Sequence, residues 1–123
     1  MSTLGILLIS GGHERAHYAL VMATGAAALG RDVTLFATNA GCRLLLAGET
    51  PDADPREALL AARGVAGIGT LLDAAGELGI RMIACEAGLA AEGLRDAALA
   101  AGVERAGVAT FLEAVGQGQI VTL

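Results

Sequence analysis

Residues 4–38 read LGILLIS, GGHERAHYALVMATGAAALG and RDVTLFAT in succession, and this stretch decides the fold. Residues 4–10 are almost continuously apolar rather than alternating, which is typical of a strand buried on both faces of a parallel sheet. Residues 15–29 are strong helix formers, and Gly30 predicts the end of that helix. Residues 32–38 predict a second buried strand. Together the three segments predict a βαβ unit, whose crossover is almost always right-handed.

The rest of the chain continues this alternation of short helices and strands. Asn39 is a candidate cap for a short helix through Leu46, and the two prolines, Pro51 and Pro55, predict a loop over residues 48–54. Residues 56–63 are expected to form either a helix or a mobile flap. The remaining expected helices are 68–78, one or two turns within 88–100 broken near Gly93, and 108–115, and the remaining strands are 81–85, 103–105 and 119–123.

An internal repeat favours this assignment. Residues 67–80 (GIGTLLDAAGELGI) align with residues 107–120 (GVATFLEAVGQGQI), and six of the fourteen positions are identical. Both copies predict a helix, a glycine and then a strand, which is the repeating unit of an open α/β sheet. A length of 123 residues fits one domain covering the whole chain, residues 1–123.

Composition excludes several classes of function. The chain has eight basic residues, all of them arginine, against thirteen acidic ones, and only 2% of its residues are aromatic. It therefore lacks the basic stripe and the stacking platforms of nucleic-acid-binding proteins. The absence of lysine excludes a Schiff-base lysine and a Walker-type phosphate lysine. We expect no metal site, because the two histidines and two cysteines are dispersed along the chain, and no cofactor.

Targeting signals are also missing from the sequence. The N-terminus has no positively charged region followed by a cleavage site, and no apolar stretch reaches the roughly 20 residues of a membrane span. Two cysteines are too few for a secreted disulfide scaffold. We therefore expect a cytoplasmic protein without a membrane span.

Cys85 is the best candidate for a reactive residue. It ends a predicted strand and precedes a predicted helix, and ligands of open parallel sheets bind at the carboxyl ends of the strands. The N–H groups at a helix start favour a thiolate, whereas the carboxylate of the adjacent Glu86 disfavours one. The alternative is a buried structural cysteine. Cys42 follows the second strand, so it either lies at the same edge, within reach of a disulfide or of sulfur exchange, or packs into the core.

The loop at residues 11–15, GGHER, follows the first strand and opens the first helix, where α/β folds hold anions. It matches neither glycine-rich nucleotide-binding motif. His13 or His17 is a candidate to donate a hydrogen bond to a ligand or to shuttle a proton, although His17 on an apolar helix also fits a hydrogen-bonded core residue. The acidic residues near the prolines are expected to form a solvated loop: Glu49, Asp52, Asp54 and Glu57.

Three segments taken together resemble the DsrE/DsrF-like family of small sulfur-relay proteins, over essentially the whole chain. They are HYALVMATGAAALGRDVTLFAT at residues 17–38, IACEAGL at 83–89 and GVATFLE at 107–113. The second segment departs from the pattern at Glu86 and Gly88, and it has no basic residue before Arg95 to stabilise a thiolate.

The resemblance implies a three-layer α/β/α domain with a five-stranded, mainly parallel sheet, assembled as a homo-trimer or homo-hexamer. It also implies that Cys85 relays sulfane sulfur as a persulfide between donor and acceptor proteins, of rhodanese-like or TusA-like type, with His17, His13, Cys42 and Glu86 as supporting candidates. Two alternatives stay open. One is a non-catalytic module that binds a small anion or nucleotide near residues 11–14, and the other is a thiol redox sensor that uses Cys42 and Cys85.

Overall fold

The computed structural model describes residues 2–48 and 53–123. Its five strands are β1 (Leu4–Leu8), β2 (Val33–Ala37), β3 (Arg81–Cys85), β4 (Glu104–Ala106) and β5 (Gln119–Thr122), and all pair in parallel in the order β4-β3-β2-β1-β5. The helices are α1 (His13–Ala28), the 3-10 helix η1 (Asn39–Leu45), α2 (Pro55–Ala62), α3 (Ile68–Glu77), α4 (Glu86–Ala91) and α5 (Val108–Val115). The predicted α/β fold with a five-stranded parallel sheet is confirmed.

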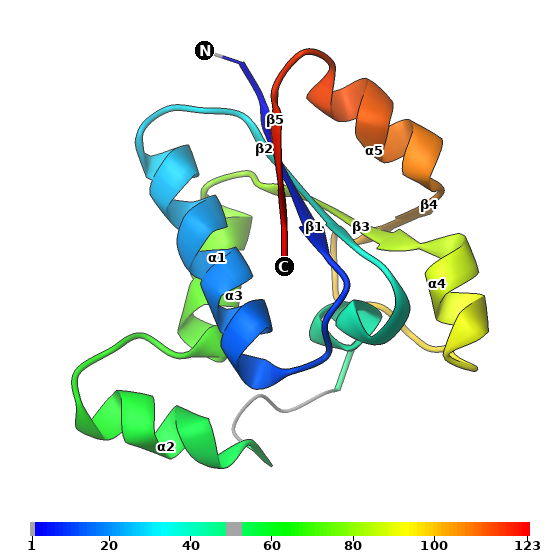
Figure 1. Cartoon of the computed structure of the whole chain (residues 1–123). Helices are drawn as coiled ribbons and strands as arrows, with labels where there is room; N and C mark the ends of the chain where they lie inside the picture. The colour runs from blue at the N-terminus through cyan, green and yellow to red at the C-terminus, as the bar shows by residue number, and fades with distance from the viewer. Residues whose placement is uncertain (1, 49–52) are drawn as a thin grey trace.

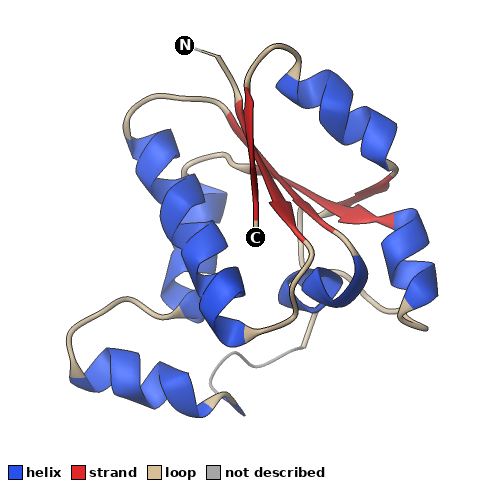
Figure 2. Ribbon diagram, viewed as in Figure 1, coloured by secondary structure: helices blue, strands red, loops and turns tan. Residues whose placement is uncertain are grey.

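The helices lie on both sides of the sheet (Figures 1 and 2). The chain steps across the sheet from β1 to β4 and then returns past β1 to reach β5. Because right-handed crossovers in opposite directions fall on opposite faces, α1 and α3 cover one face and α5 covers the other. The molecule therefore has the three layers that the resemblance implied.

Two apolar clusters fill these layers. On the α1 and α3 side, the buried residues of β1 are Leu4, Ile6 and Leu8, and small alanines of α1 pack against them. On the α5 side, Phe111 stacks on Phe36 with ring centroids 5.0 Å apart. Every residue of β2 is buried, as expected for a strand that contributes side chains to both layers.

The segment after β2 differs from the expectation. Residues 39–45 form a 3-10 helix, and the predicted role of Asn39 as its cap is wrong: Thr38 occupies the cap position, without a side-chain hydrogen bond. The first turn is instead held by the residue that follows β1, because the Gly41 N–H donates to the Ile9 carbonyl over 2.9 Å. A Cβ at Gly41 would collide with the Leu8 carbonyl oxygen. Close backbone packing, rather than capping, shapes this turn.

The other predicted elements are close to those observed. The helices at 56–63, 68–78 and 108–115 and the strands at 81–85, 103–105 and 119–123 are all present within one or two residues. The helix expected within 88–100 begins earlier, directly after β3, and ends at Ala91. Leu99 then forms an antiparallel bridge with Leu46. The loop predicted for residues 48–54 falls largely on residues 49–52, outside the described part of the chain.

Among the described residues, no helix combines the length and the apolar character needed to cross a bilayer.

We predict that Phe111→Ala destabilises the protein by about 3–5 kcal/mol, because it removes the main side chain of the α5 layer and leaves a cavity against Phe36. Urea unfolding followed by circular dichroism measures this loss. Leu112→Ala is the matched control, since Leu112 lies on the same helix but is 51% exposed. Its free energy of unfolding is expected to change by no more than about 0.5 kcal/mol. Equal effects of the two substitutions would contradict the layer assignment.

Candidate functional site

Cys85 ends β3 at the carboxyl edge of the sheet and is the cap residue of α4. Its Sγ accepts a hydrogen bond from the Gly88 N–H over 3.3 Å. This N–H belongs to the first turn of the helix, where backbone donors have no partner within the helix. A donor aimed at sulfur stabilises the negative charge of a thiolate.

The side chain of Cys85 lies on the α5 side of the sheet, in the cluster with Phe36, Ile83 and Phe111. Leu7 and Ala106, both partly buried, complete its surroundings. The residue is 7% exposed, so the sulfur sits at the edge of the sheet but is largely shielded from water. Such shielding limits oxidation and requires a partner to approach closely.

Gly88 fixes the position of α4 relative to the sheet. A Cβ at this residue would collide with the Asn39 nitrogen and the Thr38 hydroxyl. Only glycine therefore allows the first turn of α4 to pack directly on the start of η1. That contact also aims the Gly88 N–H at the Cys85 sulfur.

Cys42 lies nearby on η1 but is enclosed. It is fully buried, and its S–H points to the Ala37 carbonyl oxygen over 3.5 Å. Burial raises the pKa of the Cys42 thiol, and charges at Cys85 and Glu92 raise it as well, while a backbone contact with Cys85 opposes them. Both cysteines are free thiols. Cys85 ends β3 and Cys42 lies on η1, after the neighbouring strand β2, and the two residues pack in different apolar clusters.

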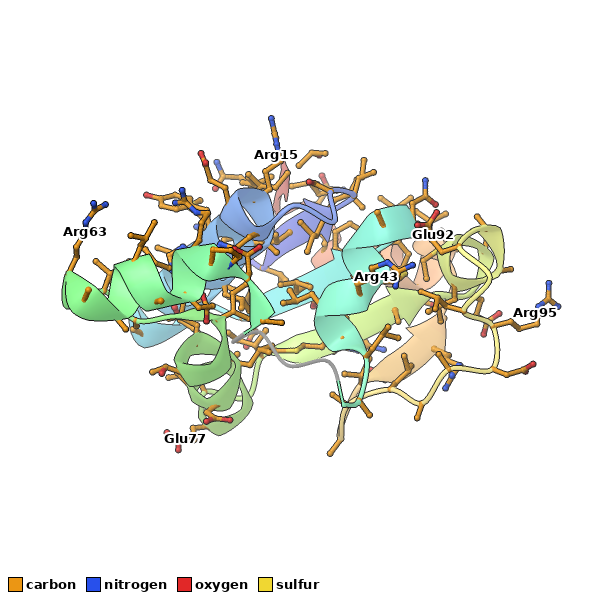
Figure 3. The ribbon with its side chains drawn as sticks, turned by 90° about the horizontal axis from the view of Figure 1, so that it is seen from below. Arg15, Arg43, Arg63, Glu77, Glu92 and Arg95 are labelled. Carbon is orange, nitrogen blue, oxygen red and sulfur yellow. The ribbon has the colours of Figure 1, made fainter. Side chains whose placement is uncertain are left out.

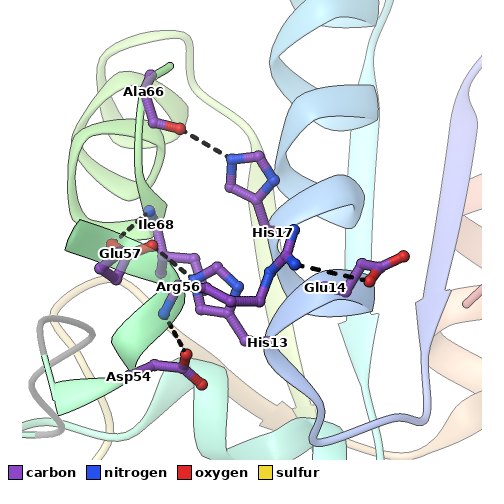
Figure 4. Close-up of polar contacts among 8 residues, drawn as sticks. All are labelled: His13, Glu14, His17, Asp54, Arg56, Glu57, Ala66 and Ile68. Atoms are coloured by element: carbon purple, nitrogen blue, oxygen red, sulfur yellow. Dashed lines mark hydrogen bonds and ion pairs between the residues drawn. The ribbon is translucent and has the colours of Figure 1, made fainter. Parts of the chain in front are cut away.

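His13 and His17 lie on α1 and are held by the segment around α2 (Figure 4). The His13 Nε2 is 2.6 Å from Glu57 Oε2, and the His17 Nε2–H donates to the Ala66 carbonyl over 2.8 Å. The two rings stack with centroids 5.8 Å apart. His17 is therefore a hydrogen-bonded core residue, one of the two interpretations of the sequence, and neither ring lies in the cluster that contains Cys85.

Glu57 was expected in a solvated acidic loop, and that expectation is wrong. It is buried, and its Oε1 accepts the Ile68 N–H over 2.9 Å while its Oε2 binds His13. It is the one buried residue of α2, and it ties that helix to α1 and α3. One weak signal for this burial was present in the sequence, namely Gly67. A Cβ at that position would collide with the Glu57 carboxylate. Asp54 caps α2, and Glu49 and Asp52 lie outside the described residues.

A groove with a volume of about 390 Å³ runs beside α4. Glu86, an exposed residue, lines the groove together with two arginines, Arg95 and Arg105. The Arg105 guanidinium donates to the Ala97 carbonyl, and Figure 3 shows Arg95 at the opposite side of the molecule from Arg63. The sequence around Cys85 shows no basic residue before Arg95, but pairing of β4 with β3 brings Arg105 to the same region. The residues next to Cys85 in the sequence did not indicate that Arg105 would lie there.

The family model of the DsrE/DsrF-like family matches residues 4–123. The chain belongs to the DsrE/DsrF-like family.

Solved structures share the fold of this DsrE/DsrF-like chain. The ychN protein from E. coli superposes with a TM-score of 0.78 at 16% identity, and the match covers 100% of both chains. The protein of unknown function MTH1491 from Methanobacterium thermoautotrophicum gives a TM-score of 0.67 at 15% identity, also over 100% of both chains. A search of curated proteins by sequence finds no match. Family membership links the chain to sulfur-relay proteins, and these structures support its fold.

We predict that Cys85 reacts with a thiol reagent faster than Cys42 in the folded protein. Cys42 is fully buried and its pKa is raised, so little of it is thiolate at neutral pH. Time-resolved alkylation with iodoacetamide, followed by peptide mass spectrometry, measures both rates. Faster labelling of Cys42 would contradict the burial described here.

We predict that Glu57→Ala loosens α2. The substitution removes an acceptor from His13 and from the buried Ile68 N–H, at a cost of about 1–3 kcal/mol. Trypsin cleavage after Arg56 and Arg63 then becomes faster, and hydrogen exchange increases over residues 55–68. Glu14→Ala is the control, because Glu14 is exposed and contacts Arg56 only at 4.0 Å. A cleavage rate unchanged from wild type would show that Glu57 does not hold the helix.

Proposed function

We propose that this protein carries sulfane sulfur as a persulfide on Cys85. The observation that carries the proposal is the placement of the Cys85 sulfur at the carboxyl edge of β3, where it accepts the Gly88 N–H. Membership of a sulfur-relay family points to the same chemistry. The Gly88 N–H is suited to stabilise negative charge on the Cys85 sulfur, both when the thiolate forms and when an acceptor takes the outer sulfur and leaves Cys85 as a thiolate.

The proposed transfer has two balanced steps. The Cys85 thiolate attacks the outer sulfur of a donor persulfide, R–S–SH, so that a new S–S bond forms to Cys85 and the donor leaves as the thiolate R–S⁻. An acceptor thiolate, A–S⁻, then attacks the outer sulfur of the Cys85 persulfide. The product is A–S–SH, and Cys85 returns as a thiolate. No external oxidant or reductant is consumed.

Partner proteins would approach at the groove beside α4. Arg95 and Arg105 supply two positive charges there against the one carboxylate of Glu86, while the chain as a whole carries a net charge of −5. An acidic segment of a partner would therefore be steered to this groove and repelled elsewhere. Rhodanese-like and TusA-like proteins are the proposed donor and acceptor, and we propose a homo-oligomer as the working assembly.

Access to Cys85 is the physical demand on this proposal. With 7% of the residue exposed, the outer sulfur of a donor must enter between α4 and the α5 layer. A partner that docks on α4 meets this demand by bringing its reactive cysteine close to the edge of the sheet. The same shielding would protect the persulfide from water and oxidants between the two steps.

We predict that the wild-type protein gains the mass of one sulfur atom when incubated with polysulfide or with a persulfidated donor protein. Intact mass spectrometry measures the gain, and peptide mapping places it on Cys85. Cys85→Ser abolishes the gain, and Cys42→Ala, the matched control, retains it because Cys42 is enclosed. Dithiothreitol removes the added sulfur.

Two results would overturn the proposal. The first is a sulfur gain that persists undiminished in Cys85→Ser. The second is a wild-type protein that stays unmodified by every donor while its Cys85 still reacts with iodoacetamide.

A further inference from the structure

A second cleft opens at the carboxyl ends of β1 and β2, away from the α4 groove. It has a volume of about 370 Å³, within the range of pockets that hold small molecules. The loop after β1, η1 and the start of α2 form its walls. The residues that matter for the argument are Ser10, His13, Arg43, Leu44, Asp54 and Ile68.

His13 lines this cleft and carries an unpaired ring nitrogen. Its side chain is 5% exposed, and its Nδ1 is buried without a hydrogen-bond partner among the described residues. Buried polar atoms are nearly always paired in folded proteins. Because Glu57 occupies Nε2, Nδ1 is the atom left for a ligand.

Two further features favour negative charge in the same place. The first turn of α1, a helix of 16 residues, has Gly12 at its cap and no side-chain hydrogen bond there. Its first backbone N–H groups therefore have no capping side chain, and His13 and Ala16 of this turn line the cleft. Arg43 on η1 lines the cleft and is exposed, and Figure 3 shows it at the carboxyl edge of the sheet. These polar groups come from three sources: a ring nitrogen, a helix start and a guanidinium.

The carboxylates near the cleft in the described part of the chain are largely paired with other groups. Glu57 binds His13 and the Ile68 N–H. Asp54 lines the cleft, but its Oδ1 accepts the Arg56 N–H over 2.8 Å as the cap of α2. Glu14 is exposed and faces Arg56. Among the described lining residues, Arg43 and the Nδ1 of His13 are therefore the polar groups that remain for a ligand.

The rest of the lining is apolar. Ala16 of α1, Leu44 of η1, Pro55 of α2 and Ile68 of α3 each contribute to it. A bare inorganic anion would leave this part of the cleft unused, whereas a short hydrocarbon chain would bury apolar surface against it.

We propose that this cleft binds a small organic anion, with an oxyanion head at His13, Arg43 and the start of α1, and a short apolar body against Leu44, Pro55 and Ile68. The head is a carboxylate or a phosphate, which share the same donors. The site is separate from Cys85 and does not depend on the persulfide proposal.

The test uses the full-length protein and nuclear magnetic resonance at constant ionic strength. The carboxylate probes are acetate and pentanoate, the phosphate probes are inorganic phosphate and butyl phosphate, and butanol is the uncharged control. We expect saturable shifts of the amides of residues 11–15 and 41–44 and of the His13 ring. The pentanoate or butyl phosphate is expected to bind roughly fivefold more tightly than its short counterpart, consistent with one or two buried methylene groups.

Variants separate the site from general charge effects. Arg43→Ala is expected to weaken binding by roughly tenfold, because a charge-assisted contact to the head is lost. Arg63→Ala, which removes an exposed arginine outside the cleft lining, leaves affinity unchanged. His13→Gln also weakens binding, and Arg43→Ala keeps the test decisive if the histidine variant unfolds.

Equal affinity of wild type and Arg43→Ala, or shifts that never saturate, would overturn the site. Saturable binding of butanol as strong as that of pentanoate would overturn the anionic head. Equal affinity for the short and long probes would overturn the apolar body.

Discussion

Parallel pairing of strands that are buried on both faces is the constraint on which the rest of this structure depends. The central strand β2 is buried at every position, and it separates the α1 and α3 layer from the α5 layer. Parallel alignment brings the carboxyl ends of all five strands to one edge of the sheet, so every residue that follows a strand is delivered there. Cys85, Cys42 and the loop that leads into His13 share this edge for that reason alone.

The edge divides into two chemically different regions. At the end of β3, Cys85 accepts the Gly88 N–H within a shielded apolar cluster, and a groove with two arginines lies beside it. At the ends of β1 and β2, His13 lines an open cleft with Arg43. The first region combines a cysteine thiol with an arginine-lined groove. The second offers hydrogen-bonding groups, and no cysteine is among its described lining residues. It therefore suits the binding of a ligand better than covalent chemistry.

Glu57 links this second region to the rest of the fold. A buried carboxylate is costly unless it is paired and hydrogen-bonded, and Glu57 meets that requirement through His13 and the Ile68 N–H. Because α2 buries little else, its attachment rests largely on this one side chain. The composition of residues 49–57 suggests a solvated acidic loop, so the role of Glu57 became visible only when α1 and α3 were brought beside it.

The sequence alone determined the order and type of nearly every element, because continuous apolar runs and glycine stops are local signals of buried strands and helix ends. It also singled out Cys85, since a strand end before a helix is a local feature. The resemblance of the sequence to the DsrE/DsrF-like family agrees with the match of the family model. Only the tertiary structure decided that Arg105 lies near α4, that Glu57 is buried against His13, and that the two cysteines pack in different layers. These contacts join residues far apart in the chain, and such pairings depend on strand order and on which face each helix covers, neither of which a local pattern records.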